Sequence, residues 1–311
     1  MLFIKILKVG IKIVSLRIIN FKKYNIMATF ERKLDQSIID GLTKSDLWKN
    51  HLKEDCEKQE VFLAIRKNEI GFYHKGGKLF GFDEKSEFKT HIKYAAVIDN
   101  TDKDYLTQCE LETEKLISDF SGNYKRIKEN CSLYSGVEAQ GVSEIYHKHS
   151  YLSNEDIVVL DIEVSFKAID ENKKQDRIDI LLYDTKKRKL KFVEAKHFSN
   201  SEIWSKSKPK VIKQIDKYQE QIAKKKPEII KAYENYITVI NKIFDKKLPL
   251  PNEVDEEVSL LIFGFDKNQL NGRLNELIRE NQEYKGYKVY CIGGIDGVNL
   301  DTLWKTNHIK L

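Results

Sequence analysis

Residues 176–184 read DRIDILLYD, and residues 190–198 read LKFVEAKHF. Side chains of a β-strand point alternately to its two faces. Both segments have the short, apolar-rich character of strands, and residues 184–191 (DTKKRKLK) contain a basic turn. The simplest pairing of two strands joined by so short a connection is an antiparallel hairpin. The rest of the chain is expected to be arranged around this hairpin.

One face of the predicted hairpin carries two acids beside one ammonium group, namely Asp179, Glu194 and Lys196. Burying charged groups in apolar strands costs free energy unless they are paired. Such a set suits a divalent cation and a water molecule that must be deprotonated. Two simpler readings stay open: Lys196 only neutralises Glu194, or all three side chains face solvent. A register slip of one residue would move Asp179 to the opposite face.

The order Asp-x(14)-Glu-x-Lys continues into a predicted helix over residues 210–225 with the pattern Gln-x3-Tyr, Gln214 to Tyr218. This ordered set resembles the PD-(D/E)xK nuclease superfamily, in particular its lambda-exonuclease-like branch. The resemblance covers residues 138–222. It implies an α/β (α+β) fold of the restriction-endonuclease-like type, with a mixed central sheet flanked by helices.

The resemblance also implies roles for the residues of the hairpin. Asp179 and Glu194 would be catalytic and would ligate Mg²⁺, or alternatively Mn²⁺, with the backbone carbonyl of Ala195 completing the arrangement. Lys196 would orient or deprotonate the attacking water, or stabilise developing charge. A lysine ordinarily titrates near pH 10.4, and neighbouring acids raise that pKa further. A positioning and electrostatic role is therefore favoured at least as much as a base role.

Two further acids are candidates for the same site. Glu144 lies on a helix predicted over residues 137–149, and its order and spacing match the helix acid of the related nucleases. An ordinary exposed glutamate is the alternative. Glu163 is a candidate metal ligand on the strand predicted over residues 157–168, where Asp161 shares its face. The alternative is an edge strand that carries charges against mispairing.

Four residues are candidates for contacts with nucleic acid: Arg177, Lys210, Gln214 and Tyr218. The last three are spaced four apart on one helix stripe, from which side chains could reach a phosphate backbone. A solvated stripe is the alternative. The basic segments 186–191 and 206–213 would add salt-dependent affinity that does not depend on base sequence.

The remaining chain is divided into three parts by its patterns. Residues 1–27 are apolar with regularly spaced basic residues, and we expect either a basic amphipathic leader or sequence upstream of a start at Met27. Residues 28–105 predict a small α+β unit, with helices followed by strands and a hairpin turn at residues 75–78. Residues 106–311 are assigned to the nuclease-like domain. A helix is expected over residues 104–130.

Composition narrows the class of protein. The 54 Lys and Arg exceed the 48 Asp and Glu, a net charge of +6, which is compatible with a polyanionic partner without being diagnostic. The four cysteines show no CxxC spacing and are read as free thiols of a reducing compartment. No GKS or GKT motif of a phosphate-binding loop is present. Basic residues interrupt every apolar run before it reaches the length of a membrane span.

These observations predict a cytoplasmic, metal-dependent nuclease without a membrane partner, acting on nucleic acid, most readily DNA, in restriction or defence against mobile DNA. A homodimer is expected if both strands of a duplex are cut. Two hypotheses of other classes remain. One is a catalytically inactive nucleic-acid-binding module on the same fold. The other is a regulatory or scaffolding protein in which the charged cluster is a structural ion pair.

Overall fold

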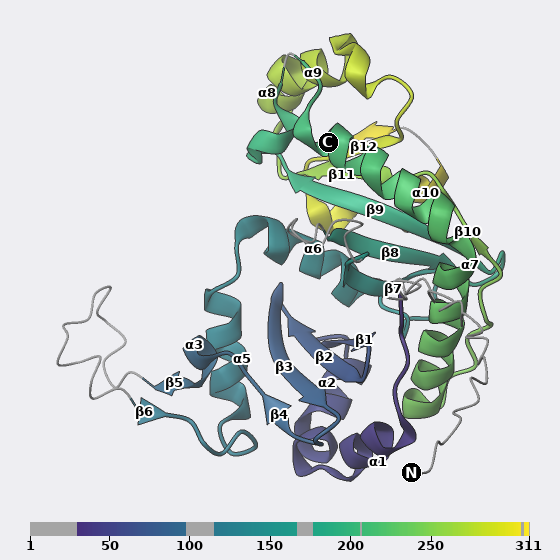
Figure 1. The fold of residues 1–311 in the computed structure, drawn as a ribbon. Helices are drawn as coiled ribbons and strands as arrows, with labels where there is room; N and C mark the ends of the chain where they lie inside the picture. The colour runs from purple at the N-terminus through teal and green to yellow at the C-terminus, as the bar shows by residue number, and fades with distance from the viewer. Residues whose placement is uncertain (1–29, 98–114, 167–176, 206, 306–307, 311) are drawn as a thin grey trace, which may run out of the picture.

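A computed structural model describes residues 30–97, 115–166, 177–205, 207–305 and 308–310. Within these ranges the chain is a mixed α/β protein with one sheet of four strands, one of seven and one of two (Figure 1). The expected leader over residues 1–27 lies outside the described ranges. None of the helices in these ranges has a stretch that is long and apolar enough to cross a membrane.

The N-terminal unit combines short helices with an antiparallel sheet of order β1-β2-β3-β4, as the sequence predicted. Its turn between β2 and β3 contains Lys75 (φ 45°) and Gly76 (φ 86°), the left-handed pair that closes a tight hairpin. A Cβ at Gly76 would lie 2.6 Å from the carbonyl oxygen of Ala139, so only glycine fits this contact. The elements are α1 (Gln36–Lys44), η1 (Trp48–Leu52), α2 (Lys53–Glu57), β1 (Phe62–Arg66), β2 (Glu69–His74), β3 (Gly77–Asp83) and β4 (Phe88–Lys89).

The expected helix over residues 104–130 is wrong for residues 115–123. Leu116 is exposed and belongs to a short strand, and the helix begins only at Tyr124. Asp119 explains the late start, because its carboxylate accepts the N–H groups of Ser121 and Gly122 in a turn that competes with helix. The elements of this region are α3 (Ile92–Ala95), β5 (Ala96–Val97), β6 (Lys115–Leu116) and α5 (Tyr124–Leu133).

Helix α5 packs against α3 and against β2 and β3. The structure therefore groups residues 115–133 with the N-terminal unit, although the sequence assigned them to the nuclease-like domain. The predicted boundary at residues 105–106 itself lies outside the described ranges.

The core sheet has the order β13-β12-β11-β9-β8-β7, with β10 beside β9. The strands β7, β8 and β9 are antiparallel, whereas β9, β11, β12 and β13 run parallel. The predicted hairpin is therefore confirmed, and β7 is an edge strand. The strands are β7 (Ile157–Val164), β8 (Ile178–Asp184), β9 (Lys189–His197), β10 (Glu253–Val254), β11 (Ser259–Phe263), β12 (Val289–Ile292) and β13 (His308–Lys310).

Helices α6 and α7 lie on opposite sides of the core sheet in the view of Figure 1. The helix predicted over residues 210–225 is longer in the structure, because α7 continues through Pro227 with a kink at Lys225 (φ −114°, ψ 15°), as a proline within a helix causes. The helical elements are α6 (Val137–Lys148), η2 (Ser201–Ile203), α7 (Lys210–Phe244), α8 (Lys267–Gln269), η3 (Leu270–Leu274), α9 (Asn275–Glu280), η4 (Gln282–Tyr284), η5 (Ile295–Gly297) and α10 (Leu300–Lys305).

The N-terminal unit is joined to the core by a fully buried acid, Asp161 on β7. Its carboxylate accepts from Arg32 Nε (3.1 Å), Arg66 Nη1 (2.7 Å) and the hydroxyl of Tyr233 on α7 (2.9 Å). It also accepts the N–H of Ile162 (2.8 Å). Asp161 is thus taken up in a connection between three parts of the fold, and it does not extend the acidic site considered for it from the sequence.

Candidate active site

The β8–β9 register brings Asp179, Glu194 and Lys196 to one face of the sheet. Leu181 lies opposite Phe192, so two residues further toward the open end of the hairpin Asp179 and Glu194 share that face. The paired residues end at Ile180 and Val193. Beyond that pair, the Ala195 N–H donates to Asp179 Oδ2 at 2.8 Å. At the end of the backbone pairing between β8 and β9, the Asp179 carboxylate therefore takes the hydrogen bond that a backbone carbonyl would otherwise accept from Ala195.

Lys196 connects the site to the start of α7 through a chain of ion pairs. Its Nζ lies 2.8 Å from Glu194 Oε1 and 3.4 Å from Glu202 Oε2. Glu202 also pairs with Lys210, the first residue of α7. The side chains of Lys196 and Glu194 are only 8% and 2% exposed, so the reading in which the three charged groups face solvent is wrong.

The electrostatics of the cluster are dominated by burial and by an excess of acid. Burial raises the pKa of Asp179 to about 7, and the charges of Glu138 and Glu163 add to this, while Lys196 opposes it. Burial and the charge of Asp179 raise the pKa of Glu194 well above its usual range. Burial alone would lower the pKa of Lys196, but Glu194 and Asp179 outweigh it and the pKa is raised. Lys196 is therefore a fixed positive charge shared by several acids.

Glu194 has one oxygen without a protein partner. Its Oε2 is buried and accepts no hydrogen bond from any described residue. Leaving a buried carboxylate oxygen unsatisfied costs free energy, so it needs a specific explanation. A cation bound beside this oxygen would satisfy it and would offset the excess negative charge.

The described residues contain no group of three His, Cys, Asp or Glu side chains already arranged as metal ligands. Mg²⁺ does not require one, because it commonly takes only one or two carboxylates and completes its shell with waters and substrate phosphate. Asp179 and the unsatisfied oxygen of Glu194 are hard oxygen donors of this kind. The residues present therefore fit a bound Mg²⁺ or Mn²⁺ ion.

The helix acid that reaches the site is Glu138, in the first turn of α6. Its Oε2 accepts from the N–H of His197 (2.9 Å) and from Asn200 Nδ2 (2.8 Å). Glu138 also lines a cavity of about 120 Å³ together with Asp179. Glu144, the helix acid selected from the sequence, is exposed six residues further along. Six residues are about one and two-thirds turns of helix, which directs the two side chains to different sides.

Glu163, the candidate metal ligand on β7, lines the same cavity. It adopts a left-handed backbone conformation (φ 49°) at the end of β7. Its Oε2 pairs with Arg177 Nη1 at 2.6 Å, and both side chains are largely exposed (39% and 61%). Glu163 contributes charge to Asp179, but its closest partner is a solvent-accessible arginine.

The four residues selected for nucleic-acid contacts occupy different environments. Tyr218 is 2% exposed and its hydroxyl donates to the carbonyl of Arg177 (3.0 Å), so its role is to hold the start of β8, and the prediction that it contacts nucleic acid is not supported. Gln214 is partly buried, and its Oε1 has no partner among the described residues. Lys210 is exposed and reaches the cluster through Glu202.

Comparisons of the chain with protein-family models, with curated proteins and with solved structures found no match. The function of the site is therefore inferred from its own geometry and chemistry.

Proposed function

We propose that this chain is a metal-dependent nuclease that hydrolyses phosphodiester bonds, with DNA as its substrate and Mg²⁺ or Mn²⁺ as its cofactor. We assign the core a restriction-endonuclease-like fold, in which α6 precedes the antiparallel strands β7 to β9 and α7 leads to the parallel strand β11. The observation that carries the proposal is the unsatisfied, buried oxygen of Glu194 beside Asp179 and Lys196. A place in restriction or defence against mobile DNA rests on the resemblance alone.

Each residue of the cluster has a role in this proposal. Asp179 and Glu194 hold the ion, with the Ala195 carbonyl as a further oxygen donor. The bound ion supplies positive charge for the scissile phosphate and lowers the pKa of water. Lys196 stays protonated because its pKa is raised, so it orients the phosphate and stabilises developing negative charge, and it does not act as a base. Glu138 holds the chain after β9 in place through His197 and Asn200.

A structural ion-pair cluster is the second candidate, and a specific observation favours it. Lys196 contacts both Glu194 and Glu202, as a lysine with a purely stabilising role would. That candidate predicts no cleavage, and it predicts a large loss of stability when Lys196 is replaced.

The direct test of the proposal is cleavage of linear duplex, circular duplex and single-stranded DNA, and of RNA, in Mg²⁺, Mn²⁺ or EDTA. We expect cleavage of DNA that EDTA abolishes. Cutting of the circular substrate would identify an endonuclease, and restriction to linear substrate an exonuclease. Binding without cleavage in either metal would support the inactive binding module. If the protein neither binds nor cleaves any of these substrates, the structural ion-pair cluster is the candidate that remains.

Lys196→Gln should lower the cleavage rate on the order of 10²-fold or more. Lys191 on the same strand provides the matched control, because it is also buried but pairs with Asp255 (3.4 Å), away from Lys196. Lys191→Gln should leave the rate per folded molecule unchanged. Circular dichroism and a urea titration of both variants separate loss of chemistry from loss of fold. Equal losses of rate in the two folded variants would contradict the assignment of Lys196.

A further inference from the structure

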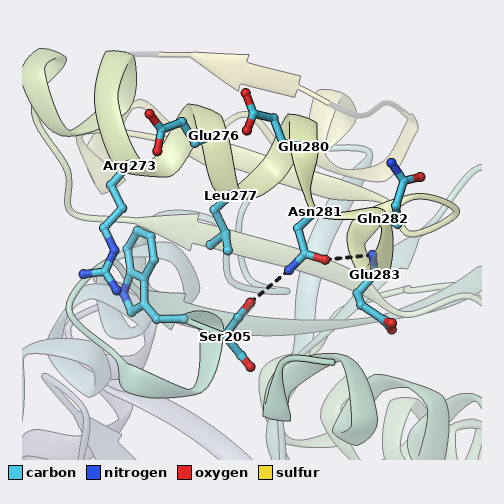
Figure 2. A pocket seen from close by; sticks show the side chains of 9 residues that line it. Ser205, Arg273, Glu276, Leu277, Glu280, Asn281, Gln282 and Glu283 are labelled. Atoms are coloured by element: carbon cyan, nitrogen blue, oxygen red, sulfur yellow. Dashed lines mark hydrogen bonds between the residues drawn. The ribbon is translucent and has the colours of Figure 1, made fainter. Parts of the chain in front are cut away.

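A second cavity is a cleft of about 740 Å³. It lies between residues 204–205, which follow β9, and the helical segment of η3, α9 and η4. Its volume is within the range of ligand sites in proteins. In Figure 2, Arg273, Leu277 and Asn281 extend from the helical segment toward Ser205, whereas Glu276 and Glu280 extend away from it. Trp204 completes the lining on the side of Ser205. The cleft thus has a mixed lining, in which Trp204 and Leu277 are the apolar side chains and three glutamates are the acids.

Trp204 is held in one orientation by its neighbours. Its Nε1 donates to the carbonyl of Phe198 (2.9 Å), and the two rings meet edge to face with centroids 5.0 Å apart. The Cζ atom of Arg273 lies 4.0 Å from the centroid of the Trp204 ring. No ion pair joins Arg273 to an acid among the described residues. A guanidinium stacked on an indole in this way presents its own outer face, on which another flat, polar group can stack.

The cleft is connected to the candidate active site over very few residues. Trp204 follows two residues after Glu202, whose carboxylate pairs with Lys196. Phe198, which holds Trp204, follows two residues after Lys196. A polymer whose phosphodiester lies at Lys196 would therefore bring a neighbouring unit to the cleft.

The acidic side chains of the cleft determine which part of a nucleic acid can enter it. Glu276, Glu280 and Glu283 belong to its lining, and their carboxylates repel phosphate groups. A nucleobase has no charge and presents a flat face for stacking. A base inside a duplex cannot enter, since it is already stacked and paired.

We infer that the cleft binds one unpaired nucleobase of the strand that is cut, stacked on the Arg273 guanidinium that Trp204 supports. The inference rests on the proposed nuclease function and specifies its substrate: single-stranded DNA, or a duplex with an unpaired end. Phosphates stay on the side of Lys196 and Lys210, and the base enters the cleft beside Arg273 and Leu277.

The test measures binding separately from cleavage, by fluorescence anisotropy of a labelled single-stranded oligonucleotide in EDTA. Trp204→Ala should weaken binding about 10-fold or more, the usual effect of removing a stacking aromatic residue. Trp204→Phe should retain most of the affinity. Tyr134→Ala is the control, because Tyr134 is likewise an aromatic residue with a cation near its ring (Lys93 Nζ, 5.4 Å), but it is exposed and lies outside the cleft. Its affinity should equal that of the wild type.

Oligonucleotides with one abasic position identify the stacked base. In the wild type, a single abasic position should lower affinity by about the same factor as Trp204→Ala, and in Trp204→Ala the same abasic position should have no further effect. If Trp204→Ala does not fold, Leu277→Glu, which adds a carboxylate and keeps Trp204, should give the same loss.

The possible results separate this inference from the nuclease proposal. The base site would be refuted if folded Trp204→Ala binds the oligonucleotide as tightly as the wild type. It would also be refuted if an abasic position weakens binding to Trp204→Ala as much as binding to the wild type. Both results would hold against the base site even if Mg²⁺-dependent cleavage is found. Binding that depends on Trp204, without cleavage in any metal, would support the base site and refute the nuclease. Absence of any binding by the wild type would refute both.

Discussion

Asp161 and Glu194 are both buried acids of the core sheet, yet their surroundings differ in one respect. The carboxylate of Asp161 accepts four hydrogen bonds, from two arginines, a tyrosine and a backbone N–H. Glu194 receives Lys196 on one oxygen and nothing from the described residues on the other. Within one sheet, Asp161 is therefore a buried carboxylate with both oxygens hydrogen-bonded, and Glu194 is one with an oxygen that lacks a partner among the described residues.

The comparison separates structural from chemical roles. A buried charge whose hydrogen bonds are all made holds parts of a fold together, and it loses that role when one partner is removed. A buried charge that is left incomplete costs stability and is retained only for another reason. We therefore read Asp161 as the connection between the N-terminal unit and the core, and the Glu194 cluster as the site of chemistry.

The largest effect is expected from Asp161→Asn. Replacing this carboxylate leaves Arg32, whose side chain is only 7% exposed, without its anionic partner. Loss of one partner of a buried ion pair typically costs about 3–5 kcal/mol. Urea titration should show this decrease in the free energy of unfolding, while cleavage per folded molecule stays unchanged. A decrease of less than about 1 kcal/mol would show that the hydrogen bonds of Asp161 do not stabilise the fold.

Addition of Mg²⁺ should stabilise the folded protein, since the proposed site binds the ion only when folded. At ten times the dissociation constant this gain is about 1.4 kcal/mol. Thermal or urea unfolding with and without Mg²⁺ measures it. Glu194→Gln should lose the gain, whereas Asp161→Asn should keep it at its lower stability. The same gain in all three proteins would place the ion elsewhere.

Glu138→Gln and Glu144→Gln compare two acids of one helix. Glu138 accepts from His197 and Asn200 next to the cluster, whereas Glu144 is exposed. Residues that hold the ligands of a metal site typically change activity about 10-fold or more when altered. We expect this loss in the single-turnover rate of Glu138→Gln and none in Glu144→Gln. A loss confined to Glu144→Gln would restore the helix acid selected from the sequence.

His147 shows that an unsatisfied buried atom can also belong to the fold. Its Nδ1 is buried without a partner among the described residues, and burial lowers its pKa to about 3. Its pKa in the unfolded chain is about 6.5, so the unfolded state binds more protons between these values. The contribution of His147 to the free energy of unfolding is therefore fully present above about pH 6.5 and is lost as the pH decreases toward about 3.

His147→Asn should weaken this pH dependence and leave the part due to His74, whose pKa burial also lowers, together with a part of opposite sign due to Asp179 and Glu194, whose pKa values are raised. Free energies of unfolding from pH 4 to pH 7 measure the effect. An unchanged slope in the variant would assign the pH dependence to other groups.

The sequence predicted the hairpin and its charged face because both follow from strict local rules. The two-residue period of strands and the short turn place Asp179 and Glu194 on one face without knowledge of the rest of the fold. The turn at Lys75 and Gly76 was predicted for the same reason. The parallel pairing of β11 with β9, in contrast, depends on contacts distant in sequence.

What the sequence did not show depends on tertiary structure. Glu202 enters the site because the segment after β9 turns back, and Glu138 because the first turn of α6 lies at the end of that strand. Neither position has a periodic signal. Tyr218 was expected on a helix stripe that reaches nucleic acid, but it is buried and its hydroxyl donates to the carbonyl of Arg177, next to β8. Order and spacing along the chain could not distinguish Glu138 from Glu144.

Asp179→Asn tests the central claim most directly, because the amide has the shape of the carboxylate and can still accept the Ala195 N–H. Asp184→Asn is its control, since Asp184 is also a buried acid of β8, at the turn end of the hairpin. We predict that Asp179→Asn keeps or gains stability and loses Mg²⁺-dependent DNA cleavage by about 10²-fold or more, while Asp184→Asn cleaves like the wild type. Cleavage by Asp179→Asn at the wild-type rate, or its unfolding, would contradict the account.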